Sequence, residues 1–167
     1  MDIVAHSLWS MVLLPGPPSV AKVIFGIAPD AAVFATSLTV QAFKGKMQPG
    51  FKTRQEMMEW YDRKENRWIV NLYKWTHSLI IWALLLIPLF IYYFFFLNQV
   101  PWFLLAAPIH ILMDIPTHDN NSFPVQFLTP FSTLRVNGLH WSKAWVFIGN
   151  YVLIIIVIYF RIFVLRK

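Results

Sequence analysis

The sequence contains a long apolar stretch from Leu79 to Leu97, in which none of the nineteen residues is charged. A membrane-spanning helix needs about 20 predominantly apolar residues. Within the hydrocarbon core the backbone must satisfy its own hydrogen bonds, so a single segment that crosses it is helical. A second uncharged run, Ala144 to Phe160, ends at Arg161. These two segments predict an all-α integral membrane protein.

The composition agrees with a membrane location. The chain is 57% hydrophobic and 13% charged, whereas soluble domains carry about 25% charged residues. The net charge of +6 does not indicate a nucleic-acid-binding protein, because no Lys or Arg lies between Trp75 and Leu134. There is no cysteine, which excludes disulfides and thiolate metal sites. The N-terminus has no basic segment ahead of an apolar run, so no cleavable signal peptide is expected.

The first 43 residues are apolar but are divided by prolines. Residues 2–14 predict a short helix that Pro15-Gly16-Pro17-Pro18 ends, and Ser19 is expected to cap a second apolar segment running to Ala28. Neither segment is long enough to span a bilayer. The pattern therefore predicts a helical hairpin, a break at Pro29-Asp30, and a third helix from Ala31 to Phe43. On this topology His6 and Asp30 emerge at the same membrane face.

The remaining segments predict one membrane domain, residues 1–167, with about three transmembrane helices. Residues 44–74 carry most of the positive charge and are expected to be cytoplasmic. Within them Thr53 and Glu56 have the spacing of a helix cap with a capping box. Residues 101–115 are expected to return across the membrane after the 79–97 helix, and 117–143 to form a polar loop. The basic tail Arg166-Lys167 would then lie on the opposite side.

Three ionisable side chains follow one another at four-residue steps in the returning segment: His110, Asp114 and His118. Steps of four place side chains on one face of a helix. At bilayer depth each such group costs several kcal/mol unless it is paired or faces a cavity. Histidine nitrogens and carboxylate oxygens are ligands of zinc, manganese and iron(II), so a divalent metal site is predicted, with zinc favoured. Pro116 is expected to bend the helix and to turn His118 away.

His77, in Thr76-His77-Ser78, precedes the 79–97 helix and is expected at the same membrane level as this group. Asp114, His118 and Asp119 are the candidate catalytic residues, because a carboxylate or imidazole can take the proton of a metal-activated water. His140 and Arg135 are interpreted as interfacial. The same cluster could instead form a hydrogen-bonded contact between helices.

Two other reaction classes are excluded by their motifs. The chain has no cysteine nucleophile and no Gly-x-Ser-x-Gly segment. Type 2 phosphatidic acid phosphatases also use a His-x3-Asp at a membrane face, but they need an arginine just upstream of the histidine. The upstream run here, Val100 to Ile109, contains none.

Several short motifs resemble, in order and spacing, those of the membrane-bound metal-dependent hydrolase family, the inner-membrane hydrolases that include LexA-regulated members. They are Ala5-His6-Ser7, Ala28-Pro29-Asp30, Thr76-His77-Ser78, His110-x3-Asp114 and Gln126-Phe127-Leu128-Thr129-Pro130-Phe131-Ser132. The resemblance extends from His6 to about Trp141. It implies a metal site formed by His6, Asp30, His77, His110 and Asp114. Family members carry a His-Arg pair shortly before Thr-His-Ser where this chain has Leu72-Tyr73, and His118 is the candidate to compensate.

The sequence therefore predicts a metal-dependent hydrolase in a bacterial or archaeal cytoplasmic membrane, with its polar site near the cytoplasmic face. Its expected substrate is a membrane lipid or a small phosphoester or ester, and its expected surroundings are the lipid bilayer, with no nucleic acid. The alternative is a membrane protein without enzymatic activity whose polar cluster binds a metal or another ion. The sequence specifies neither the substrate nor the oligomeric state.

Overall fold

The computed structural model describes residues 1–45 and 49–163, which form seven α-helices, one 3-10 helix and no strand. This confirms the predicted all-α fold. Three helices are long and apolar enough to cross a membrane: α2 (Val20–Phe43), α5 (Leu79–Phe96) and α7 (Ala144–Phe163). Two apolar segments are shorter, namely α1 (Ile3–Leu13) and the combination of η1 (Trp102–Leu105) with α6 (Ala106–Thr117).

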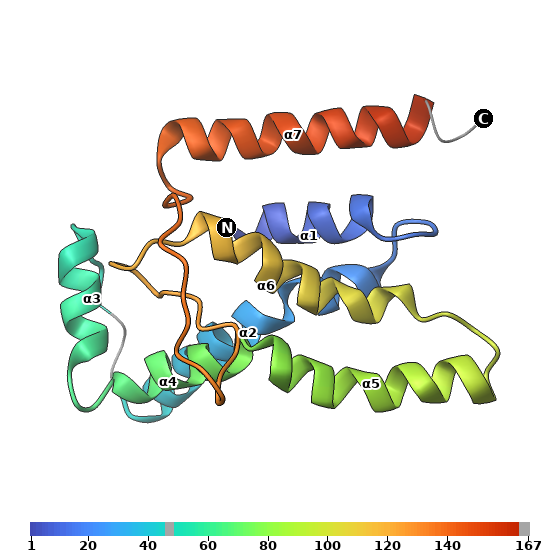
Figure 1. Cartoon of the computed structure of the whole chain (residues 1–167). Coiled ribbons are helices and arrows are strands. Elements are labelled where there is room, and N and C mark those ends of the chain that lie inside the picture. The colour runs from blue at the N-terminus through green and yellow to red at the C-terminus, as the bar shows by residue number, and fades with distance from the viewer. Residues whose placement is uncertain (46–48, 164–167) are drawn as a thin grey trace.

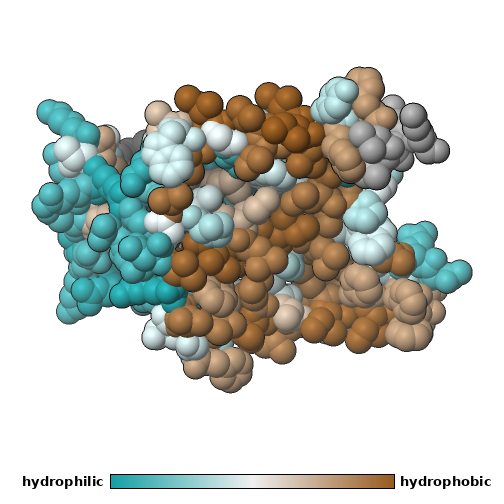
Figure 2. All heavy atoms as spheres, turned by 45° about the horizontal axis from the view of Figure 1, so that its top comes forward, coloured by the Kyte–Doolittle hydropathy of each residue, from teal (hydrophilic) through white to brown (hydrophobic). Residues whose placement is uncertain are grey.

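The apolar helices run side by side, and the polar residues gather at one end of them. In Figure 1, α1, α5, α6 and α7 lie along a common direction, with the loop between α1 and α2 at one end and α3 (Arg54–Asp62) at the other. Figure 2 shows hydrophilic atoms concentrated at the α3 end and a broad hydrophobic surface over the rest of that face. The basic tail Arg166-Lys167, and residues 46–48 of the charged segment, lie outside the described residues.

Helix α2 differs from the prediction, because Pro29-Asp30 does not break it. The helix is continuous from Val20 to Phe43, and Pro29 is buried inside it. Proline removes one backbone hydrogen bond, but neighbouring helices stabilise such positions in membrane proteins. Here α2 packs against α1, α4 (Arg67–Thr76) and α6. The third long helix is therefore α2, and the returning segment that contains α6 is shorter than the three candidate spans.

Two predicted helix caps are present in the structure. Ser19 precedes α2 and its side chain accepts a hydrogen bond from the backbone N–H of Lys22. Thr53 precedes α3 and accepts one from the N–H of Glu56 at 3.1 Å. Each cap satisfies one of the N–H groups that a helix start leaves without an internal partner. The charged segment thus begins a separate helix at the polar end of the molecule.

Two hydrophobic clusters hold the helices together. One joins α2, α4 and α6 to the loop after α6, and its buried members are Val33, Tyr61, Ile69, Tyr73, Ile111, Phe123 and Val125. The other joins α1 to α7 through Met1, Ala5, Trp9 and Ile154. Trp9 also donates its indole N–H to the amide oxygen of Asn150, 2.8 Å away, on α7. Both clusters lie beside the polar group described next.

The loop after α6 returns along the end of that helix. The backbone N–H of Gly138 donates to the carbonyl of His118 at 2.9 Å, and that of Leu139 donates to the carbonyl of Pro116 at 2.8 Å. A Cβ at Gly138 would lie 2.3 Å from the Pro116 oxygen, so glycine is required at this approach. These contacts satisfy carbonyls that the helix end leaves free and fix the backbone at His118.

Candidate metal centre

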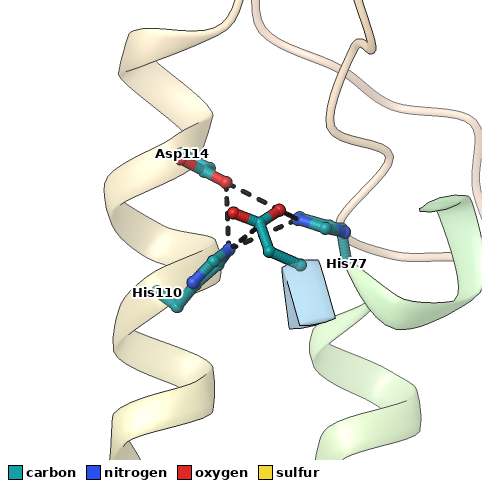
Figure 3. Close-up of side chains that lie close together, drawn as sticks. His77, His110 and Asp114 are labelled. Carbon is teal, nitrogen blue, oxygen red and sulfur yellow. Dashed lines mark hydrogen bonds and ion pairs between the residues drawn. The ribbon is translucent and has the colours of Figure 1, made fainter. Parts of the chain in front are cut away.

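Four ionisable residues that are distant in sequence meet in the interior. Asp30 comes from the middle of α2, His77 from the junction of α4 and α5, and His110 and Asp114 from one face of α6. Each offers one ligand atom, and these four atoms all lie within 4.8 Å of one another. Figure 3 shows His77, His110 and Asp114 pointing toward a common centre. The structure thus brings together four of the residues that the sequence analysis selected.

The spacing of these atoms suits a single small cation. The His110 Nε2 atom lies 3.3 Å from His77 Nε2 and 3.2 Å from Asp114 Oδ2. The His77 Nε2 atom lies 3.4 Å from Asp30 Oδ1 and 3.6 Å from Asp114 Oδ2. Zinc binds such atoms tetrahedrally at about 2.0–2.2 Å, which places neighbouring ligands about 3.3–3.5 Å apart. The observed separations match that requirement.

Backbone carbonyls fix which nitrogen of each ring faces the centre. His110 Nδ1 lies 2.7 Å from the carbonyl oxygen of Gly26, and His77 Nδ1 lies 3.1 Å from that of Tyr73. A carbonyl only accepts hydrogen bonds, so Nδ1 is the donor in both rings, and each neutral ring presents the lone pair of Nε2. A hydrogen bond of this kind behind a histidine is the usual support of a metal ligand.

The local sequence explains why those carbonyls are available. Gly26 lies where α1 crosses α2, and a Cβ there would be 2.0 Å from the Oγ of Ser10. Only glycine therefore allows the close approach of the two helices. Tyr73 lies one turn before His77, at the end of α4, and its ring stacks on the imidazole at 3.8 Å between centroids. Ring stacking and the carbonyl contact together orient His77.

Asp114 is buried between two groups of partners, one at each carboxylate oxygen. Its Oδ2 atom faces His77 and His110 and has no hydrogen-bond partner among the described residues. Its Oδ1 atom forms an ion pair with the amino group of Met1. A buried carboxylate oxygen without a hydrogen bond is costly. The Oδ2 atom therefore indicates a missing cationic partner at the position where the two Nε2 atoms also point.

His6 lies next to this group without being one of its four members. Its Nε2 atom is 3.1 Å from Asp114 Oδ1, and its ring stacks on that of His110, with 3.5 Å between centroids and 16° between planes. Within the described residues neither ring nitrogen of His6 has hydrogen-bond geometry to a partner. His6 thus contacts the Asp114 oxygen that faces away from His77 and His110, and its side chain is buried.

His118 and Asp119, the other predicted catalytic residues, lie just after α6. His118 is the C-cap of α6, and its Nδ1 atom is 3.1 Å from the Asp114 carbonyl and 3.5 Å from Asp114 Oδ1. It is not one of the four clustered residues. Asp119 instead forms an ion pair with Arg54, the first residue of α3. The polar helix α3 is thereby attached to the loop beside the cluster.

The electrostatics of the cluster favour positive charge at the Nε2 atom of His77. Burial lowers the pKa of His77, but its contacts with the carboxylates of Asp114 and Asp30 outweigh burial and raise the pKa above its ordinary value. A raised pKa means that the surroundings stabilise a cation bound to this nitrogen. A proton and a divalent metal ion would compete for the same lone pair.

The structure also places the residues that were interpreted as interfacial, and it adds supporting residues that the sequence analysis did not select. His140 bonds to Ser142 through Nδ1 and lies outside the cluster, while Arg135 is exposed. The residues not selected are Gly26, Tyr73 and Arg54. A glycine four residues before Asp30, and a tyrosine four residues before His77, are the only sequence signals for the first two.

Fold and site together define the class: an all-helical membrane protein with a buried His/Asp group that could hold a metal ion. Comparison with protein-family models, with curated proteins and with solved structures finds no match. The assignment of function therefore rests on the geometry of the site and on the chemistry of its residues.

Proposed function

We propose that this protein is a metal-dependent membrane hydrolase that cleaves a phosphoester or ester. The observation that carries the proposal is the convergence of two imidazole Nε2 atoms, each fixed by a backbone carbonyl, on the unpartnered Oδ2 of Asp114. Asp30, His77, His110 and Asp114 would hold the ion, with zinc favoured over manganese or iron(II) by the two imidazole ligands. When bound there, such an ion supplies an activated water and polarises the substrate oxygen.

The surrounding residues have roles that follow from their contacts. His6 has no hydrogen bond on either ring nitrogen within the described residues and lies against Asp114 Oδ1, so it is positioned to accept a proton beside the metal ligands. His118 contacts the same oxygen and orients the Asp114 carboxylate. Asp119 pairs with Arg54 and would position the loop after α6 rather than act on the substrate.

The depth of the site supports a lipid or another amphipathic substrate. His77 lies where α4, which contains Arg67 and Lys74, gives way to the uncharged α5. This boundary corresponds to the membrane interface, where the ester and phosphate groups of lipids are found. Asp30 is the most exposed member of the cluster, with 15% of its side chain accessible. We place this interface on the cytoplasmic side of a bacterial or archaeal membrane, because residues 44–74 at the same end carry most of the basic residues.

The burial of the cluster favours a second candidate function, which is ion binding without turnover. The side chains of His77 and His110 are fully buried and that of Asp114 is 1% exposed. A hydrolase must admit both substrate and water to its ligands, whereas a site that stores or relays an ion need not. The two functions share the same ligands and differ in whether a substrate reaches them.

The deciding experiment combines metal analysis with turnover on the purified protein in mixed micelles. We expect about one equivalent of metal per chain, and hydrolysis of a p-nitrophenyl phosphodiester or ester that Asp114→Asn and His110→Ala abolish. Asp119→Asn and His140→Ala are the matched controls, because each replaces the same residue type outside the cluster. Metal without hydrolysis would establish the ion-binding function. Absence of metal from a folded protein would contradict both functions.

A further inference from the structure

Two basic side chains meet at the end of the molecule opposite to the histidine cluster. Lys22 is in the first turn of α2 and is buried, and Arg161 is near the end of α7. In Figure 1 this is the end at which the loop between α1 and α2 lies. Both side chains bind backbone carbonyls of α1 and of that loop. Lys22 donates to Leu14, Gly16 and Pro17, and Arg161 donates to Met11, Val12, Leu14 and Gly16.

These two cations lack a balancing negative charge. Within the described residues none of the Asp and Glu side chains forms an ion pair with Lys22 or Arg161. The carbonyls at the end of α1 contribute the negative pole of a helix dipole, equivalent to about half an elementary charge. Two formal positive charges therefore exceed what the helix end neutralises. Capping of α1 accounts for the hydrogen bonds but leaves a net positive site.

An apolar groove lies directly beside Arg161. Its volume is about 910 Å³, and it runs between the last turns of α1 and α7 under the loop 15–18. Leu8 and Val12 line one wall, Val157 and Ile158 line the other, and the Arg161 side chain borders it. Ligand pockets in proteins have volumes of about 300–1,000 Å³. The groove is large and apolar enough for a hydrocarbon chain and is closed at one border by a guanidinium group.

We propose that this groove binds one anionic phospholipid, with an acyl chain between α1 and α7 and the phosphate beside Arg161. The described residues provide no acceptor for the Arg161 Nε, which leaves that donor for a phosphate oxygen. Lys22 adds a second positive charge behind the same loop. Excess positive charge at the end of an apolar groove complements the phosphate and the chain of one lipid molecule.

Native mass spectrometry with two lipids of identical acyl chains tests the proposal. The wild-type protein should retain one phosphatidylglycerol per chain, at least about tenfold more tightly than phosphatidylcholine. Arg161→Gln should remove this preference, whereas Arg135→Gln, at an exposed loop arginine, should not. Val157→Trp fills the groove without changing charge and should weaken binding of phosphatidylglycerol tenfold or more. Ile155→Trp, on the exposed face of the same helix, is its control.

Inorganic phosphate distinguishes a lipid site from a simple anion site. In the proposal, millimolar phosphate does not displace phosphatidylglycerol, because it lacks the chain that occupies the groove. Displacement by phosphate together with unchanged binding in Val157→Trp would overturn the lipid assignment. Equal retention of the two lipids, or an unchanged preference in Arg161→Gln, would overturn it as well. The Val157→Trp variant keeps the test valid if Arg161→Gln fails to fold.

Discussion

The Nε2 atoms of His77 and His110 lie 3.3 Å apart, although the two residues are 33 positions apart in the chain. Both rings donate from Nδ1 to backbone carbonyls, so in their neutral forms two lone pairs face each other across this gap. Lone pairs at such a distance repel unless a positive charge lies between them. The carboxylates of Asp30 and Asp114 converge on the same point, which makes a cation the natural partner of all four groups.

We expect His77→Ala and His110→Ala each to lower metal affinity by at least about 100-fold. A group that only orients a ligand is worth about 10–100-fold in affinity, and the ligand itself contributes more. Elemental analysis after dialysis against a chelator of known affinity measures the change. His140→Ala, which removes a buried histidine outside the cluster, should keep the wild-type metal content. Equal metal retention in all three variants would show that the cluster is not the binding site.

The members of the cluster were predictable because each lies in a short motif with a clear physical signal. An aspartate and a histidine within the apolar α6 require a partner at that depth, and the spacing of His110 and Asp114 places both on one face. The alternation of helices then brings His77 to the same level. Asp30 was selected through its motif, and the structure places it beside His77.

The orientation of the rings could not be predicted, because it depends on backbone atoms. The Gly26 carbonyl reaches His110 only because α1 and α2 approach closely at a residue without Cβ. Similarly, the continuity of α2 through Pro29 is decided by tertiary packing. Buried contacts along the helix compensate for one missing hydrogen bond, while the local sequence favours a break. Local rules therefore identified the residues, and packing between helices decided their geometry.

Replacing Gly26 with alanine tests the role of that close approach. The new Cβ would lie 2.0 Å from Ser10 Oγ and 2.8 Å from Ser10 Cβ, so α1 must move away from α2. We expect a loss of about 1–3 kcal/mol in unfolding free energy from overpacking, and weaker metal binding because the carbonyl behind His110 shifts. Thermal unfolding in detergent and a metal titration measure the two effects.

The matched control is Gly149→Ala, because a Cβ at this position in α7 meets no atom within 4 Å. This variant should be as stable as wild type or slightly more so, since alanine favours a helix over glycine. Ser10→Gly should restore part of the stability of Gly26→Ala by removing the clashing side chain. If Gly26→Ala unfolds at the wild-type temperature and binds metal normally, the close approach does not support the site.

The ion pair between Arg54 and Asp119 should make a small, pH-dependent contribution to stability. Partial burial raises the pKa of Asp119, but the hydrogen bond and charge of Arg54 outweigh burial and lower it below its ordinary value. The contribution is therefore present above the unfolded-state pKa of about 3.9 and is lost as the pH falls through the lowered pKa. Because Arg54 is 36% exposed, we expect at most about 1 kcal/mol. Denaturant unfolding of wild type and Asp119→Asn should differ at pH 6 and converge at the acid end; a constant difference would contradict this linkage.

His6 provides the sharpest separation of metal binding from proton transfer. Its Nε2 atom faces Asp114 Oδ1, whereas the clustered ligand atoms face Asp114 Oδ2. We therefore expect His6→Gln to retain about one metal per chain and to lower kcat by about 100-fold or more, in the range that a positioned proton acceptor contributes. The pH dependence of kcat should also flatten, which a purely structural defect would not produce. Loss of the metal in His6→Gln, with the fold intact by thermal unfolding, would instead make His6 a fifth ligand, the role implied by its resemblance to the hydrolase motif.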